Sequence, residues 1–261
     1  MIFLKLGGSL ITDKARPEIS RPEVLARIGA EIAAARQADP GLRLLVGHGS
    51  GSFGHTAAAR YGTHHGSSTP DDWLGFAVVW EVANQLHRLV VDSLRQAGLP
   101  AMSFPPSASA VTEDGALSVM SMEPLVRALE AGLLPVVAGD VAFDRRRGST
   151  IVSTERVFSY LAPFLRPTHL LLAGIEPGVL ADYTAGKGIL PWVGLSHLTA
   201  GKITGAATTD VTGGMAEKVR HALSLVEVLP DLEIRIFSGA APGAIRRALA
   251  GEAIGTLVRA E

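Results

Sequence analysis

Gly47-His48-Gly49-Ser50-Gly51-Ser52-Phe53-Gly54-His55 is the stretch that decides the fold of this 261-residue chain. It follows the apolar run from Leu42 to Val46, which predicts a buried strand. A glycine-rich loop at the end of such a strand exposes backbone N–H groups, and a helix that begins there adds the positive end of its dipole. The stretch therefore predicts an anion-binding loop, with His55 at the junction of loop and helix.

A second glycine motif lies at the start of the chain. Lys5-Leu6-Gly7-Gly8-Ser9 carries an apolar strand, 2–6, directly into two glycines and a hydroxyl. Glycine lets the backbone approach an anion closely, and Lys5 adds a positive charge at the strand's end. The spacing matches neither a Walker A motif nor a dinucleotide fingerprint.

A third motif, Asp210-Val211-Thr212-Gly213-Gly214-Met215-Ala216-Glu217-Lys218, opens a predicted helix in the second half of the chain. Its threonine and glycines suit a helix N-terminus, and Lys218 lies one to two turns inside the helix. Taken alone, the motif could be only a helix cap with a solvated lysine. Together, the three motifs indicate an anion-binding site more strongly than any one of them alone.

Between these motifs, apolar strand-like runs alternate with helical patterns. This alternation predicts an α/β fold, a three-layer αβα sandwich with a mostly parallel central sheet covered on both faces. Ligands of such sheets bind beyond the carboxyl ends of the strands. Four strands run into glycine there: Gly7, Gly47, Gly139 and Gly174. The expected strands are 2–6, 42–46, 100–104, 133–138, 169–173, 233–237 and 255–259, and the expected helices include 73–96, 123–130, 154–165, 212–226 and 242–249. Residues 182–209 are expected to form a loop or lid.

Composition excludes several classes of function. The chain is 47% hydrophobic and 19% charged with a formal net charge of −1, so it lacks the basic excess of a nucleic-acid or membrane-surface protein. Because it contains no cysteine, disulfides, thiolate metal sites and a cysteine nucleophile are excluded. The first residues do not form a signal peptide, and no apolar run is long enough to span a membrane. We therefore expect a cytoplasmic location.

The three motifs, in this order and spacing, resemble the amino acid kinase superfamily over essentially the whole chain. Within it, Gly51-Ser52-Phe53-Gly54-His55 resembles the loop of isopentenyl phosphate kinases, as does Lys14 downstream of the first motif. Most other members of the superfamily lack a histidine at the position of His55, although fosfomycin-type kinases share much of the loop.

The resemblance implies a role for each motif in the transfer of a phosphoryl group from ATP. Lys5, Lys14 and His55 would be the catalytic residues, with no protein ligand to a metal. ATP would be bound by Lys5, Gly7, Gly8, Ser9, Gly51, Gly174, Gly214 and Lys218. The acceptor would be bound by Ser50, Gly54, His55 and Gly139. An apolar tail would also need an apolar wall, for which the face of Phe76, Val79, Trp80 and Ala83 is the candidate; the alternative is that this face is ordinary core between helix and sheet.

The resemblance also implies the reaction and the partners of the protein. The expected reaction converts isopentenyl phosphate and ATP to isopentenyl diphosphate, with Mg²⁺ held largely by ATP oxygens and water. A single domain, 1–261, would divide near residue 165 into an acceptor-binding half, 1–165, and a nucleotide-binding half, 166–261. A homodimer is expected, with no nucleic-acid or membrane partner.

Departures from the family pattern leave two alternatives open. Ser153-Thr154-Glu155 and Ala173-Gly174-Ile175-Glu176-Pro177-Gly178-Val179 both differ from the common segments, and Ser50 replaces a frequent glycine. One alternative is a kinase for another small phosphate or phosphonate, such as fosfomycin. The other is a catalytically inactive nucleotide-binding regulator, although such a protein has no need of the lysines.

Overall fold

A large central sheet organises the molecule. The computed structural model describes residues 1–182, 187–199 and 214–260, and within these ranges the sheet has eight strands. All neighbouring strands are parallel except the pair β13 and β14. In spatial order the strands are β12 (Trp192–Val193), β14 (Thr256–Val258), β13 (Glu233–Ser238), β9 (His169–Gly174), β1 (Ile2–Leu6), β2 (Leu44–His48), β6 (Leu134–Ala138) and β3 (Ala101–Ser103).

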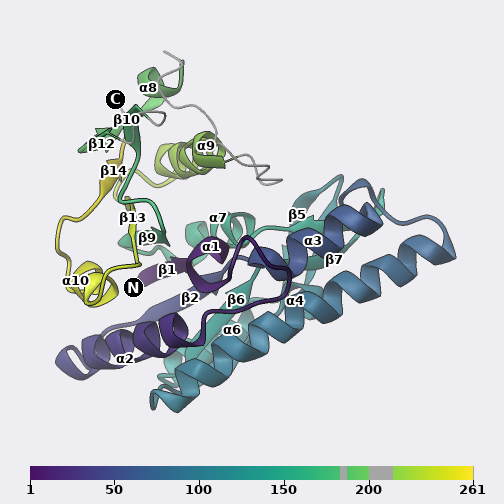
Figure 1. The fold of residues 1–261 in the computed structure, drawn as a ribbon, viewed down its shortest axis with the longest axis horizontal. Helices are drawn as coiled ribbons and strands as arrows, with labels where there is room; N and C mark the ends of the chain where they lie inside the picture. Colours follow the sequence, from purple (N-terminus) through teal and green to yellow (C-terminus); the bar gives the residue numbers. More distant parts are fainter. Residues whose placement is uncertain (183–186, 200–213, 261) are drawn as a thin grey trace.

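Helices cover both faces of this sheet, and the alternation of side chains along β1 shows how. Leu4 and Leu6 are buried on the face covered by α2 (Pro22–Ala38), α3 (Gly51–Tyr61), α4 (Pro70–Gln96) and α10 (Ala244–Leu249). Phe3 faces the other side and packs against Phe158, with ring centroids 4.9 Å apart. That side is covered by α6 (Glu123–Glu130), α7 (Thr154–Leu165) and α9 (Gly214–Val228). In Figure 1, α2 and α4 run along one side of the molecule, and α9 lies at the opposite side.

The predicted three-layer α/β fold is confirmed, with shifts of a few residues at the element ends. The long helix α4 begins at Pro70 and not at Trp73, because Thr69 and Asp72 form a capping box at its N-terminus. Gly47 lies inside β2 and does not follow it. It is glycine for a packing reason, since a Cβ atom there would come within 2.5 Å of Thr154 and 2.6 Å of Phe158.

The region predicted to be an irregular loop, 182–209, is partly ordered into short elements. Positions 183–186 and 200–213 lie outside the described residues, so the expected lid and the Asp210–Gly213 part of the third motif are not described. The described part holds several short elements: β10 (Leu180–Asp182), β11 (Lys187–Ile189), β12 and α8 (Leu195–Thr199). No helix in the described ranges is long and apolar enough to cross a membrane.

A second, smaller sheet was not predicted. Its four strands lie in the order β5 (Ala116–Met120), β4 (Ala110–Glu113), β7 (Asp140–Asp144) and β8 (Gly148–Val152). Three further short helices also escaped prediction: α1 (Gly8–Ile11), η1 (Thr63–His65) and α5 (Pro106–Ser109). All are short, and the sequence shows no helical or alternating pattern over them.

Asp144 holds the turns of this small sheet together. Its carboxylate accepts hydrogen bonds from the backbone N–H groups of Gly115, Arg146 and Arg147 at 2.7, 2.9 and 2.8 Å, and from the Thr112 hydroxyl at 2.8 Å. Burial alone would raise the pKa of Asp144, but these donors hold it below its usual value. The carboxylate therefore joins the β4–β5 turn to the β7–β8 turn.

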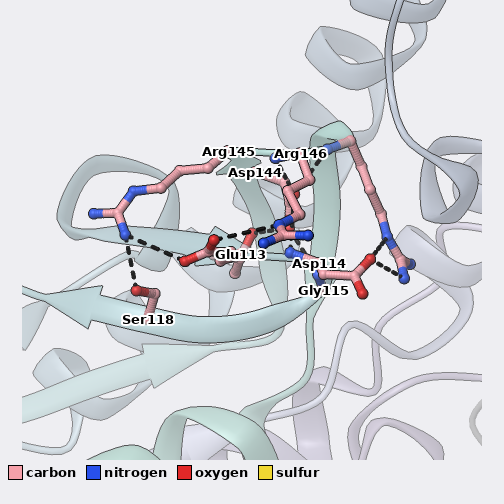
Figure 2. A network of polar contacts seen from close by, with 9 residues as sticks. Glu113, Asp114, Gly115, Ser118, Asp144, Arg145 and Arg146 are labelled. Atoms are coloured by element: carbon pink, nitrogen blue, oxygen red, sulfur yellow. Dashed lines mark hydrogen bonds and ion pairs between the residues drawn. The ribbon is translucent and has the colours of Figure 1, made fainter.

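Around this buried carboxylate, exposed ion pairs form an outer layer. Figure 2 shows Arg145 and Arg146 reaching Glu113, and Arg145 also reaching Ser118. The side chains of both arginines are more than half exposed, so these pairs contribute little to stability. The hydrogen bonds of the buried Asp144 therefore contribute more to the free energy of unfolding than the exposed ion pairs around it.

The tip of the β7–β8 hairpin is joined to the segment that precedes α4. Ser67 donates its N–H to the carbonyl of Arg147 at 2.9 Å, and the Ser67 and Ser149 hydroxyls are 2.6 Å apart. Gly148 has a φ of +76°, and a Cβ atom on it would lie 2.1 Å from the Ser67 carbonyl oxygen. The hairpin therefore lies directly against the start of α4.

We expect Asp144→Ala to lower the free energy of unfolding by about 3 kcal/mol, because the buried Gly115 N–H and Thr112 hydroxyl lose their acceptor together with two partly buried N–H groups. Glu113→Ala, which removes an exposed carboxylate from the same cluster, should cost about 1 kcal/mol or less. Urea unfolding of both variants measures the difference. Equal losses of unfolding free energy in the two variants would contradict the proposal that Asp144 holds the turns of the small sheet together.

Candidate active site

The two predicted glycine motifs meet main chain to main chain. A Cβ atom on Gly8 would lie 2.6 Å from both the Cα and N atoms of Gly51, and one on Gly49 would lie 3.1 Å from the N atom of Gly8. Gly51 has a φ of +52°, and the Thr12 side chain fills the space where its Cβ would stand. Side chains are excluded from this contact, so backbone groups form the surface here.

The other predicted glycines lie on neighbouring strand ends. Gly7 donates its N–H to the Ala173 carbonyl at 2.7 Å, which places it beside Gly174 at the end of β9. Gly139, which follows β6, donates its N–H to the His48 carbonyl at 3.0 Å. Because β9, β1, β2 and β6 are adjacent and parallel, their carboxyl ends form one edge, and the four predicted glycine positions gather along it.

A buried charge pair lies at the base of this edge. Lys5 of β1 is 8% exposed and forms an ion pair with Glu155, in the first turn of α7. Burial alone would raise the pKa of Glu155, but the ammonium of Lys5 brings it below its usual value. The carboxylate in turn keeps a positive charge in place next to the glycines. In the sequence, Glu155 stands out only as a departure from the family pattern, and no role was predicted for it.

Lys218 belongs to the same charged centre. It lies in the first turns of α9, which contacts α7, and its charge is a further cause of the lowered pKa of Glu155. Gly214 begins α9 with a φ of +66°. The structure therefore brings part of the third motif to the first, although the two are about two hundred positions apart in the sequence.

Lys14 is presented on a short loop beside the glycine-rich loop. The loop is closed by an antiparallel bridge between Thr12 and Ser20, and its Glu18 donates its N–H to the Ser52 carbonyl at 3.4 Å. The Thr12 hydroxyl donates to the Gly8 carbonyl at 2.8 Å and accepts the N–H of Ser52 at 3.1 Å. Lys14 itself is exposed. Thr12 thus links all three segments, a role that sequence analysis did not assign.

Ser50 and His55 flank the first turn of α3. Ser50 has a φ of −73°, so a serine fits there without strain, and the departure from glycine is harmless. Gly54 packs against it, since a Cβ atom on Gly54 would lie 2.6 Å from the Cβ of Ser50. His55 is partly buried, one turn after Gly51, and Ser9 is partly buried in α1.

The predicted apolar wall on α4 is partly wrong. Phe76, Val79 and Ala83 are buried, whereas Trp80, one turn after Phe76, is 45% exposed at the edge of this face. Instead, Phe76 packs with Trp73 and with Phe143 of β7, at centroid distances of 5.5 and 5.2 Å. Phe143 was missed because its strand belongs to the small sheet.

This arrangement suits the binding of polyphosphates. It combines cations at Lys5 and Lys218, main-chain surfaces at Gly8 and Gly51, and the N-terminus of the eleven-residue helix α3. Among the described residues, no group of three or more histidine, aspartate or glutamate side chains could hold a metal ion. Aromatic side chains supply an apolar surface between α4 and the small sheet.

The chain belongs to the amino acid kinase family, whose model matches residues 1–238. Among its relatives, isopentenyl phosphate kinase from Methanothermobacter thermautotrophicus is 35% identical, and the match covers 97% of each chain. Isopentenyl phosphate kinase from Haloferax volcanii is 34% identical over 100% of this chain and 99% of the other. A crystal structure described as isopentenyl phosphate kinase matches with a TM-score of 0.81 and 31% identity, covering 98% of this chain and 99% of its own.

We expect Glu155→Gln to lower the free energy of unfolding at neutral pH by about 3 kcal/mol, because the buried Lys5 ammonium loses its countercharge. The stability that an ionised Glu155 contributes is present above the usual pKa of 4.5 and is lost as the pH falls further, through the lowered pKa of the folded state. The gap between wild type and variant should therefore narrow below that pH.

Chemical denaturation at neutral pH and at about pH 3 measures this gap. Glu123→Gln is the matched control, because Glu123 pairs with Arg127 on the exposed face of α6. Its effect should stay below about 1 kcal/mol at both pH values. A gap for Glu155→Gln that does not change with pH would contradict the pairing.

Proposed function

We propose that the protein is a kinase that transfers the γ-phosphoryl group of ATP to isopentenyl phosphate, giving ADP and isopentenyl diphosphate. One observation carries the general reaction: a buried Lys5–Glu155 pair lies at the base of two glycine segments that meet main chain to main chain. The acceptor is proposed from the relatives, which are named isopentenyl phosphate kinases and match this chain over almost its full length.

The nucleotide would lie on the β1 and β9 side of the edge. We assign its phosphates to the main chain of Gly7, Gly8, Ser9 and Gly51 and to the ammonium groups of Lys5 and Lys218. Gly174 and Gly214 would border the rest of the nucleotide. The position of Gly7 beside Gly174 supports this side, because a side chain on Gly7 would meet the Ala173 carbonyl oxygen at 3.0 Å.

The acceptor would lie on the β2 and β6 side. Its phosphate would accept hydrogen bonds from His55 and from N–H groups around Ser50 and Gly54, with Gly139 at the border. Its hydrocarbon tail would extend between α4 and the small sheet, toward Phe76 and Phe143. We place the nucleotide half at 166–261 and the acceptor half at 1–165, and the order of strands supports a division between β9 and β1.

In the reaction, an oxygen of the acceptor phosphate forms a bond to the γ-phosphorus, and the bond from that phosphorus to the β–γ bridging oxygen breaks. ADP leaves with the electron pair of the broken bond. A phosphate dianion has no proton to lose, so no general base is required. Lys5 and Lys14 would neutralise charge on the transferring group, which is the main task in phosphoryl transfer.

Mg²⁺ would be bound by ATP oxygens and water, since this ion dehydrates reluctantly. The chemistry of the donors fits this arrangement: Glu155, a carboxylate at this edge of the sheet, is paired with Lys5. When bound, the ion would neutralise phosphate charge. We further propose a cytoplasmic homodimer, as in the expectation from sequence.

An assay of ADP release distinguishes the proposed function from two alternatives. A kinase for a compact phosphonate such as fosfomycin would need no apolar surface, and the aromatic group of Trp73, Phe76 and Phe143 favours a hydrocarbon tail. A catalytically inactive regulator would have no reason to bury Lys5 with a carboxylate partner beside the glycines.

We expect purified protein to release ADP from ATP and Mg²⁺ with isopentenyl phosphate, and not with fosfomycin, carbamate or no acceptor. A coupled assay for ADP measures this. Turnover with another acceptor would keep the reaction class and overturn the substrate. Nucleotide binding without turnover on any acceptor would overturn the kinase proposal.

We expect His55→Ala to raise KM for the acceptor by about tenfold to a hundredfold, because a hydrogen bond to a charged phosphate is lost. KM for ATP should change by less than about twofold, since His55 is assigned to the acceptor alone. His64→Ala, in the exposed segment after α3, is the control. An unchanged acceptor KM in His55→Ala would contradict the proposal that His55 binds the acceptor phosphate.

A further inference from the structure

Two buried histidines and a serine form a hydrogen-bonded chain behind the glycine-rich loop. His48 Nε2 of β2 and His87 Nδ1 of α4 are 2.8 Å apart, and His87 Nε2 lies 2.6 Å from Ser103 Oγ at the end of β3. At the other end, His48 Nδ1 lies 3.1 Å from the carbonyl oxygen of Gly49. His48 and His87 are 1% and 5% exposed. These hydrogen bonds thus join the exposed Ser103 to Gly49, the residue that follows β2.

These contacts allow one arrangement of protons when both imidazoles are neutral. A carbonyl oxygen only accepts, so His48 must carry its proton on Nδ1, and its Nε2 is then an acceptor. His87 must therefore donate from Nδ1, which leaves its Nε2 to accept from the hydroxyl of Ser103. Each group fixes the tautomer of the next, from Ser103 to Gly49.

Both imidazoles are neutral at physiological pH. Burial, and then the neighbouring His87 and Lys5, lower the pKa of His48 to about 3, and burial lowers the pKa of His87 to about 4. A base this weak does not activate the Ser103 hydroxyl at neutral pH, so the row of serine and histidines is not a nucleophilic triad. Its effect falls instead on the loop.

The carbonyl of Gly49 and the N–H of Ser50 belong to the same planar trans peptide and point in opposite directions. Holding this carbonyl against His48 therefore fixes the direction of the Ser50 N–H. The adjoining main chain is also held: Gly49 donates its N–H to the Leu6 carbonyl at 3.0 Å, and the His48 carbonyl accepts from Thr154 Oγ1 at 2.6 Å. The contacts of His48 and Gly49 thus fix the orientation of the peptide group between Gly49 and Ser50.

We propose that His87 is a positioning residue for the acceptor site, because its Nδ1–H fixes the His48–Gly49 contact that directs the Ser50 N–H toward the acceptor phosphate. The inference rests on the proposed function, which assigns this loop to a phosphate. A merely structural pair would satisfy its own polar atoms and would not affect phosphate binding at Ser50.

Two substitutions of His87 separate these roles. His87→Asn places an amide N–H near the former Nδ1 and keeps the donor to His48, whereas His87→Leu fills similar space without a donor. The probe is inorganic phosphate, and the readout is the shift of the Ser50 backbone amide in NMR spectra of the full chain. We expect wild type and His87→Asn to have similar Kd values and His87→Leu to bind phosphate about tenfold more weakly.

Leu89→Ala, on the exposed side of α4, controls for general disturbance of the helix. Wild-type phosphate affinity in both His87→Leu and His87→Asn would overturn the proposal, and so would an equal loss of affinity in both. The acceptor KM should follow the same order, with KM for ATP unchanged. Because the phosphate titration requires no turnover, a wrong acceptor assignment would leave its result intact and would appear only in the ADP assay.

The tautomers provide a second measurement on wild-type protein, which can contradict the proposal even if His87→Leu does not fold. Nitrogen-15 spectra of the imidazoles should show a protonated Nδ1 and a bare Nε2 on both His48 and His87 from about pH 6 to about pH 8. A proton on Nε2 of either ring would break the chain and overturn the proposal.

Discussion

Two stretches of main chain, around Gly8 and Gly51, touch with no side chain between them, and the site depends on this contact. The contact requires β1 and β2 to be adjacent and parallel, with Lys5 level with Gly47. That register sets Lys5 below the glycines, where Glu155 supplies the countercharge. Main-chain donors are thus presented above a buried cation. A Cβ atom on Gly8 would meet the main chain of Gly51 at 2.6 Å, and one on Gly51 would meet the Thr12 side chain at 2.3 Å, so neither position admits a side chain unless these segments move.

The large sheet and its helices could be predicted because their signals are local and repeated. Apolar runs such as Ile2–Leu6 and the long periodic face of α4 decide the element type within a few residues. The small sheet could not be predicted, because strands such as β5 are short, have only one fully buried residue and show no alternation. Trp80 was predicted to belong to the apolar face of α4 but is exposed at its edge, since an amphipathic pattern on a long helix does not show where the apolar face ends.

The site was partly predictable for the same reason. Each glycine motif is a continuous stretch of sequence and by itself predicts an anion-binding loop. The parallel sheet then implies that strand ends such as Gly7 and Gly139 share one edge. Contacts between distant positions gave no such signal. Glu155 meets Lys5 across 150 positions, and His48 meets His87 across 39, so neither pairing leaves a pattern in the sequence. Thr12 was likewise missed, although its side chain links three segments of the site.

The place of β1 in the sheet has a consequence for synthesis of the chain. This first strand lies between β2, which follows soon after it, and β9, which begins at His169. At ordinary translation rates one edge of Ile2–Leu6 therefore waits for its partner on the order of ten seconds. An apolar strand with an open edge is a template for pairing with other chains. The nascent chain is thus most vulnerable to aggregation before β9 leaves the ribosome, and a binding factor that covered β1 during that interval would raise the yield of folded protein.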